Sequence, residues 1–463
     1  MNAAAARVFR LSGRPSDAPP LADSELIDPN ELIDPNELID PNELIDPNEL
    51  IDPSKFRVFK RAGHFLAIFW LCIGLALLGL ALVDAVLRAA LKPAKSLRVD
   101  AQASTIAREN MAANGSERGY WQEHEAARVT QWQPYVYFRR KPYAGKLIHV
   151  DANGFRATVN PIASAALAAR PTSTSAEQRS IWLFGGSTVW GTGVSDAHTL
   201  ASELAQVLHQ QVLPWQHAPV QPVLNFGETG YVSAQSQLAF MASLRCPDAT
   251  RPEFAIFVDG VNDVYAALQS GIAGAPQNES NRQAEFNVTR SGGAFATAML
   301  ERLEGVRWLI ERVQGIPPAP DVDNLAAQVA RNYLAVIEQT RAIAAAQGVR
   351  VLFVWQPSVF DKAQPTAEER GVIGSSLLRH RDLQLTTTRA LKRLLQNTPL
   401  ADLLVLDTLF DSNNGPIFID FAHTGAAGNA LLAGRLAQEL RKSPVTAAQS
   451  VSPSQSCRDR PVF

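Results

Sequence analysis

The chain has 463 residues, 46% of them hydrophobic, and a formal net charge of -2 at pH 7. This length allows one large domain or two moderate ones with accessory segments, and the nearly balanced charge gives no electrostatic case for nucleic-acid binding. The three cysteines, Cys72, Cys246 and Cys457, have the spacing neither of metal ligands nor of a disulfide framework. Cys246 and Cys457 could pair outside the cytoplasm, and the sequence leaves this open.

A hexapeptide repeat occupies residues 25–54 and follows an Ala-, Pro- and Ser-rich N-terminus (1–24) that we expect to be disordered. The unit Glu-Leu-Ile-Asp-Pro-Asn begins at Glu25, and its last copy ends in Ser54. A proline in every unit excludes a continuous helix, and two apolar side chains per unit bury little surface. We therefore predict an acidic spacer. The alternative is a multivalent docking segment for a protein partner.

An uninterrupted apolar stretch runs from Phe65 to Val83. As a helix it would span about 28 Å, close to the hydrocarbon thickness of a bilayer. A core helix of this length would normally have a polar face, so we predict a transmembrane helix over residues 64–86 with the bilayer as its partner. The stretch is too long, and begins too late, for an ordinary signal peptide.

Basic residues flank the apolar stretch on both sides, so the positive-inside rule gives weak guidance on orientation. The upstream set lies nearer to its membrane boundary, which favours a cytoplasmic N-terminus and a periplasmic or extracellular C-terminal part. The basic residues are Lys55, Arg57, Lys60 and Arg61 before the stretch, and Arg88, Lys92, Lys95 and Arg98 after it.

Residues 93–160 form a juxtamembrane region that is rich in aromatic side chains. We expect these rings to pack against the main domain; a platform for stacking a ligand is the alternative. Residues 163–179 have the composition of a linker or surface loop. The aromatic residues are Tyr120, Trp121, Trp132, Tyr135, Tyr137, Phe138 and Tyr143.

From Ser180 onward, short apolar strands alternate with amphipathic helices, which predicts a parallel sheet covered on both faces. We expect this domain to cover residues 180–442, with an insertion at 266–322 and a disordered tail at 443–463. The predicted strands are 181–184, 223–226, 254–258, 349–355 and 403–406, and the predicted helices lie within 200–212, 324–347, 383–395 and the segment that carries Leu432, Leu436 and Leu440.

Polar residues that carry chemistry follow these strands. Ser187 comes directly after the first strand, Gly230 after the second and Asn262 after the third, and Asp420 and His423 stand three residues apart near the C-terminal helix. Ligands bind at the carboxyl ends of the strands in an open parallel sheet, so the fold would bring these groups to one edge. A hydroxyl, an amide and a carboxylate–imidazole pair are the parts of acyl-transfer catalysis.

Four blocks in this order resemble the SGNH hydrolase superfamily, the GDSL-type esterases. They are Gly185-Gly186-Ser187-Thr188, Asn225-Phe226-Gly227-Glu228-Thr229-Gly230, Gly260-Val261-Asn262-Asp263 and Asp420-Phe421-Ala422-His423. The resemblance implies a flavodoxin-like α/β/α fold with five parallel strands in the order 2-1-3-4-5. The segment Val150-Asp151-Ala152-Asn153-Gly154-Phe155-Arg156 also resembles an element that precedes the domain in membrane-anchored bacterial members.

The same resemblance implies roles for the residues of the blocks. Ser187 would be the nucleophile, His423 the base and Asp420 its orienting carboxylate. The backbone N–H groups of Ser187 and Gly230 and the side-chain amide of Asn262 would form the oxyanion hole. The first block departs from the eponymous Gly-Asp-Ser-Leu pattern, because Gly186 stands where that pattern has an aspartate that is not part of the triad.

The sequence thus predicts a membrane-anchored serine esterase without cofactor or metal, acting on an acylated small molecule or on the acyl groups of an envelope glycan. Three alternatives remain: an O-acyltransferase of an envelope polysaccharide, a degenerate domain that serves only in docking, and a metal site at Asp420 and His423, for which no third ligand has suggestive spacing. A phosphate-binding P-loop would need a lysine near residues 191–193, and the sequence has none there. Asp263 is expected to stabilise its own loop.

Overall fold

The computed structural model describes residues 53–90, 119–161, 180–210, 222–245, 252–288, 290, 293, 321–374 and 377–442. The predictions for the N-terminus, for the repeat before Pro53, for residues 163–179 and for the tail after Lys442 lie outside this part of the chain, as do Cys246 and Cys457. The chain divides into two compact units, Met1–Ala81 and Leu82–Phe463.

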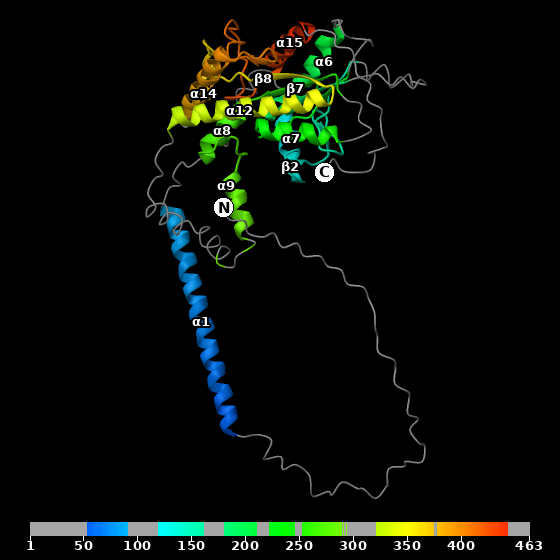
Figure 1. Ribbon diagram of the computed structural model, residues 1–463. Coiled ribbons are helices and arrows are strands. Elements are labelled where there is room, and N and C mark those ends of the chain that lie inside the picture. Colours follow the sequence, from blue (N-terminus) through cyan, green and yellow to red (C-terminus); the bar gives the residue numbers. More distant parts are fainter. Residues whose placement is uncertain are drawn as a thin grey trace, which may run out of the picture. The chain divides into compact units, whose positions relative to one another are not determined.

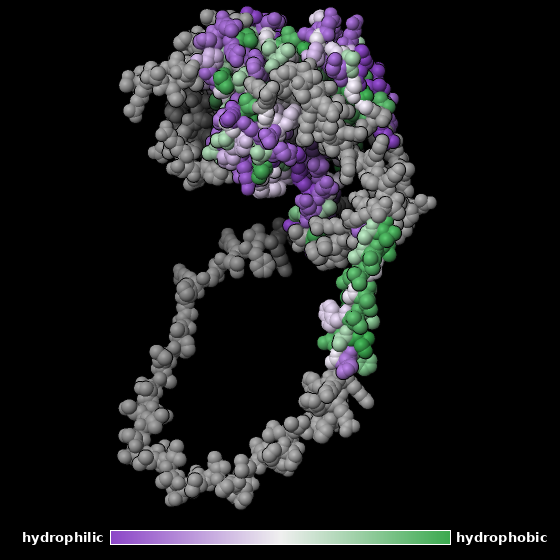
Figure 2. All heavy atoms as spheres, turned by 180° about the vertical axis from the view of Figure 1, so that it is seen from behind, coloured by the Kyte–Doolittle hydropathy of each residue, from purple (hydrophilic) through white to green (hydrophobic). Residues whose placement is uncertain are grey.

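Helix α1 extends from Pro53 to Ala90 and contains the apolar stretch (Figures 1 and 2). Its segment Gly63–Val86, 24 residues long, is apolar enough and long enough to cross a membrane by length and composition. Leucine, isoleucine and phenylalanine side chains are exposed all along it, and Cys72 is an exposed free thiol. Residues 65–83 of this segment are all apolar, so the helix is apolar on every side there.

The centre of the C-terminal unit is a five-stranded parallel sheet with the strand order β6-β5-β7-β8-β9. In chain order this is 2-1-3-4-5, so the predicted α/β fold class is confirmed. The strands are β5 (Ile181–Gly185), β6 (Val223–Asn225), β7 (Phe254–Asp259), β8 (Arg350–Trp355) and β9 (Leu403–Val405).

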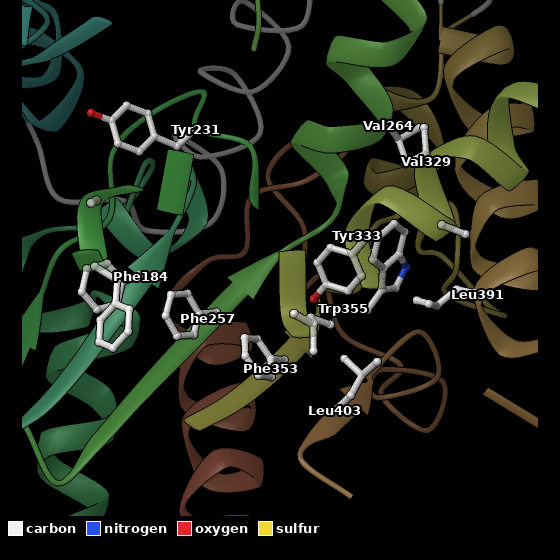
Figure 3. Packing of buried hydrophobic residues seen from close by; sticks show 14 of the residues in the cluster. Phe184, Tyr231, Phe257, Val264, Val329, Tyr333, Phe353, Trp355, Leu391 and Leu403 are labelled. Carbon is white, nitrogen blue, oxygen red and sulfur yellow. The ribbon is translucent and has the colours of Figure 1, made fainter. Parts of the chain in front are cut away.

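Side chains alternate between the two faces of the sheet, and each face has its own core. On one face, Phe184, Phe257 and Phe353 occupy the same register row of β5, β7 and β8, and their rings stack at 5.1 and 5.2 Å between centroids (Figure 3). On the other face, Leu183 and Ile256 belong to an aliphatic core. Burial on both faces explains why these strands are continuous apolar runs in the sequence.

Helices cover both faces. The aromatic face packs against α7 (Ser233–Leu244), α8 (Val261–Ser270), α12 (Val322–Ala346) and α14 (Leu378–Asn397), and the aliphatic face packs against α6 (Leu200–Gln210) and α15 (Ala426–Lys442). The shorter helices are α3 (Tyr120–Ala126), α5 (Ser187–Trp190), the 3-10 turn η1 (Asp196–His198), α9 (Glu279–Val288) and α13 (Ala367–Val372).

Residues 119–161 form α3 and two small antiparallel hairpins, β1 (Thr130–Gln133) with β2 (Tyr137–Arg140) and β3 (Tyr143–Ala144) with β4 (His149–Val150). Packing of the aromatic rings against the main domain occurs for Tyr120, whose hydroxyl accepts from the N–H of Gly193 at 2.7 Å. The side chains of Trp132 and Tyr135 are instead largely exposed, at 69% and 68%.

Two further differences from the sequence prediction concern helices. Helix α7 was not predicted, because its buried positions carry serine and glutamine and so show no apolar period. Helix α8 continues to Ser270, past the predicted start of the insertion at residue 266.

Candidate active site

Ser187 is the first residue of α5 and directly follows the glycine pair that ends β5. Its backbone N–H is therefore one of the first-turn groups without a partner inside the helix. Gly186 lies so close to the Asn262 side chain that an added Cβ would be 2.2 Å from Asn262 Nδ2. Glycine at this position lets the third block approach the nucleophile, and any side chain there would require the Asn262 amide to shift.

The three predicted catalytic residues form one hydrogen-bonded chain. His423 Nε2 lies 2.6 Å from Ser187 Oγ, and His423 Nδ1 lies 2.5 Å from Asp420 Oδ2. The second carboxylate oxygen of Asp420 accepts from the backbone N–H groups of Ala422 and His423 at 2.8 and 2.7 Å. The aspartate thus fixes both the backbone of its loop and the ring of His423.

The electrostatics of the pair favour an ionised aspartate. Burial raises the pKa of Asp420, but the charge of His423 and the hydrogen bonds from His423 and Ala422 outweigh it and hold the pKa below its ordinary value. An ionised Asp420 accepts a hydrogen bond from Nδ1–H of His423, which leaves the lone pair of Nε2 directed at the Ser187 hydroxyl.

Thr188 and Gln356 connect the nucleophile helix to the histidine loop. Gln356 follows β8 and donates from Nε2 to Thr188 Oγ1 at 3.2 Å, while the Thr188 hydroxyl donates to the carbonyl of Ala422 at 3.5 Å. Gln356 was not among the predicted site residues. Its position directly after a predicted strand was the available signal, since such positions gather at the site edge.

The predicted oxyanion-hole residues lie at the same edge. Gly230 has φ +77°, a conformation that favours glycine, and in the part of the chain that the structure describes no acceptor is bonded to its backbone N–H. The Asn262 amide donates one N–H to the carbonyl of Tyr231 at 2.8 Å and accepts from Gln277 Nε2 at 3.1 Å. One N–H of Asn262 therefore remains for another acceptor.

Beneath Asn262 lies a buried pair of carboxyl groups. Asp263 accepts from the backbone N–H and the hydroxyl of Ser233, and Asp259 accepts from the Ser236 hydroxyl at 2.9 Å. Burial raises the pKa of both groups, and the neighbouring Asp263 raises that of Asp259 further. These contacts join α7 to the start of α8, in keeping with the loop-stabilising role expected of Asp263.

Two buried ion pairs, both missed in the sequence, support the surrounding loops. Arg140 pairs with Glu228 of the second block, Nε to Oε1 at 3.5 Å, and Arg156 pairs with Asp196 at 2.5 Å. The two guanidinium groups lie over the Trp190 ring, each 4.4 Å from its centroid. The 119–161 segment thus contacts the helix that carries Ser187. Within the residues described here, no group of three His, Cys, Asp or Glu side chains is arranged to hold a metal ion.

Comparisons with known proteins give distant structural likeness only. No protein-family model and no curated protein matches the chain. Among solved structures, the acetyl xylan esterase AlAXEase is 16% identical, with a TM-score of 0.33, and covers 56% of this chain and 98% of its own. A mutant of Axe2, an acetylxylan esterase from Geobacillus stearothermophilus, is 10% identical, with a TM-score of 0.33, and covers 58% of this chain and 97% of its own. A lipolytic protein of the G-D-S-L family from Desulfitobacterium hafniense is 12% identical, with a TM-score of 0.30, and covers 57% of this chain and 99% of its own. At such TM-scores the fold assignment rests on the strand order itself.

Proposed function

We propose that the chain is a serine ester hydrolase of the SGNH type, anchored to a membrane by α1. The observation that carries the proposal is the hydrogen-bonded chain from Asp420 through His423 to Ser187. A serine hydroxyl is a weak nucleophile until a base accepts its proton, and this arrangement supplies an oriented base. The proposed substrate is an acylated alcohol, with acyl groups on an envelope glycan as the narrower proposal.

In the proposed reaction, each of these residues has one role. Ser187 Oγ attacks the ester carbonyl carbon while its proton passes to His423 Nε2. The carbonyl oxygen becomes an oxyanion and accepts from the N–H groups of Ser187 and Gly230 and from the free N–H of Asn262. The tetrahedral intermediate collapses, and His423 returns the proton to the departing alcohol. Water then attacks the acyl-enzyme by the same steps, which releases the carboxylic acid.

The expected loss of rate differs among the residues of the site. Loss of one oxyanion donor costs a factor of about 10²–10³ in rate, whereas loss of the nucleophile or the base removes the covalent route entirely. Asp420 contributes by holding the tautomer and by stabilising the imidazolium that forms during attack. The proposal therefore predicts graded defects rather than equal ones.

The test uses the full chain in detergent. A fluorophosphonate probe should label wild-type protein and fail to label Ser187→Ala, and p-nitrophenyl esters of increasing acyl length should be hydrolysed only by the wild type. If the wild type were neither labelled nor active, the result would favour the alternative that the domain is catalytically degenerate and serves only in docking. Product analysis with a sugar acceptor separates the hydrolase from the O-acyltransferase, in which a sugar hydroxyl replaces water.

A further inference from the structure

Gln277 contacts the oxyanion site although it lies in the segment that the sequence assigned to an insertion. It is half-buried in the loop between α8 and α9. Its Nε2 donates to Asn262 Oδ1 at 3.1 Å. Its Oε1 lies against Gly230, where an added Cβ would be 3.1 Å away. One side chain therefore bonds one of the three proposed oxyanion donors, Asn262, and lies beside a second, Gly230.

The contact with Asn262 fixes which way the amide faces. In the observed orientation Asn262 donates to the Tyr231 carbonyl and accepts from Gln277. A flipped amide would place its oxygen against the Tyr231 carbonyl and its NH₂ against the Gln277 donor, and both contacts would be repulsive. The observed orientation leaves the second N–H of Asn262 unused, on a nitrogen that lies against Gly186 beside the nucleophile.

Gln277 is itself held in place. Its backbone carbonyl accepts from the Arg282 guanidinium, and that guanidinium lies 4.3 Å from the centroid of the Tyr137 ring. The Tyr137 hydroxyl in turn donates to Glu279 at 3.5 Å. These contacts attach the loop to hairpin β1–β2, so the position of Gln277 does not depend on its own side-chain bond alone.

We propose that Gln277 is a positioning residue that holds the Asn262 amide with its free N–H directed at the oxyanion. The inference rests on the proposed hydrolase function and adds to it a residue outside the four blocks. Orientation of this donor matters in the transition state, where charge develops on the carbonyl oxygen, and much less in the substrate complex. Its loss should therefore lower kcat and leave KM nearly unchanged.

The experiment compares two substitutions in the full chain. Gln277→Met keeps the length of the side chain but removes the N–H group that bonds Asn262 Oδ1. The Asn262 amide would then face the oxyanion only part of the time, so we expect kcat to fall about tenfold. Gln277→Glu places a carboxylate against Asn262 Oδ1 and favours the flipped amide, so we expect a loss of about a hundredfold, near that of Asn262→Ala. Gln283→Met, an exposed position on α9, is the matched control and should keep the wild-type kcat.

A double-mutant cycle with Asn262→Ala distinguishes positioning from other roles. If Gln277 acts through Asn262, Gln277→Met should lower kcat less than about twofold in the Asn262→Ala background. An equal loss in both backgrounds, a raised KM with unchanged kcat, or wild-type kinetics in Gln277→Met would overturn the inference while leaving the hydrolase in place. A wild type that neither reacts with the probe nor cleaves esters would refute the proposed function, and this inference with it.

Discussion

The proposed chemistry depends on a proton that moves between Ser187 and His423, with Asp420 holding the histidine. Substitutions at these three residues should not lower ester hydrolysis equally. Ser187→Ala and His423→Ala should abolish ester hydrolysis, because they remove the nucleophile and the base. Asp420→Asn should retain more activity than His423→Ala, since it removes orientation and charge support but leaves the imidazole. Initial rates with a p-nitrophenyl ester, with probe labelling as a second readout, check this order. Activity of Ser187→Ala above about a tenth of the wild type would contradict the nucleophile assignment.

Gly186 gives a second prediction at the residue scale. Gly186→Asp would introduce the aspartate of the eponymous pattern, but its Cβ would meet Asn262 Nδ2 at 2.2 Å and displace the amide. We expect kcat to fall by about 10²–10³, the cost of one oxyanion donor. The fall should be much smaller in an Asn262→Ala background, because the clashing group is then absent. Wild-type kcat in Gly186→Asp would show that the loop can move without harm to the site.

His380 should make the stability of the domain depend on pH. Its ring lies among Tyr265, Phe360 and Phe421, and neither ring nitrogen has a hydrogen-bond partner within the described part of the chain. Burial lowers the pKa of His380 to about 4. The folded state therefore disfavours protonation, and stability that is fully present above about pH 6.5 is lost progressively as the pH falls from 6.5 to about 4.

His380→Phe should remove this dependence. The wild type should lose about 2 kcal/mol between pH 8 and pH 5 through His380, because the unfolded chain binds the proton and the folded chain does not. Urea unfolding of both proteins at the two pH values measures the difference. Because the other titrating groups are shared by both proteins, an equal pH dependence in His380→Phe and wild type would show that folding does not shift the pKa of His380.

At the scale of elements, the sequence was informative where burial is apolar. The strands of the sheet are buried on both faces, and the continuous apolar runs at Ile181–Gly185 and Phe254–Asp259 identify them directly. The order of these strands came from the resemblance of the four blocks. Helix α7 escaped prediction because its buried side chains are polar and are satisfied by partners far away in the chain, as Ser236 is by Asp259 and Gln235 by the carbonyl of Val136.

The residues of the candidate site could be predicted only where a local sequence pattern marks them. Ser187, Asn262 and the Asp420–His423 pair are marked by local patterns at strand ends, and the structure brings them together. Gln277 and the Arg140–Glu228 pair have no such pattern, because their partners are chosen by tertiary packing between segments 15 and 88 residues apart. Spacing in one sequence cannot specify contacts of that kind.

For the whole molecule, the repeat should be dispensable for catalysis. Each unit offers two apolar side chains and a proline, too little apolar surface to pack onto a folded domain. Deleting residues 25–52, which ends just before α1, should leave kcat and KM of the detergent-solubilised protein within about twofold of the wild type. A larger change in either constant would mean that the repeat contacts the catalytic unit.

The orientation of α1 decides where a substrate can be found. Both Lys60 and Arg61 lie within three residues of the start of the apolar segment Gly63–Val86, whereas after it only Arg88 lies as close and the next basic residue is Lys92. The closer upstream cluster favours a cytoplasmic N-terminus, which would put the C-terminal unit outside the cytoplasm, where envelope glycans are.

A reporter that is active only in the cytoplasm should therefore work when fused before Met1 and fail when fused after Phe463. Added protease should digest the C-terminal unit, Leu82–Phe463, in intact spheroplasts. Protection of that unit would reverse the orientation and move the search for a substrate to the cytoplasm, without any change in the chemistry proposed for Ser187.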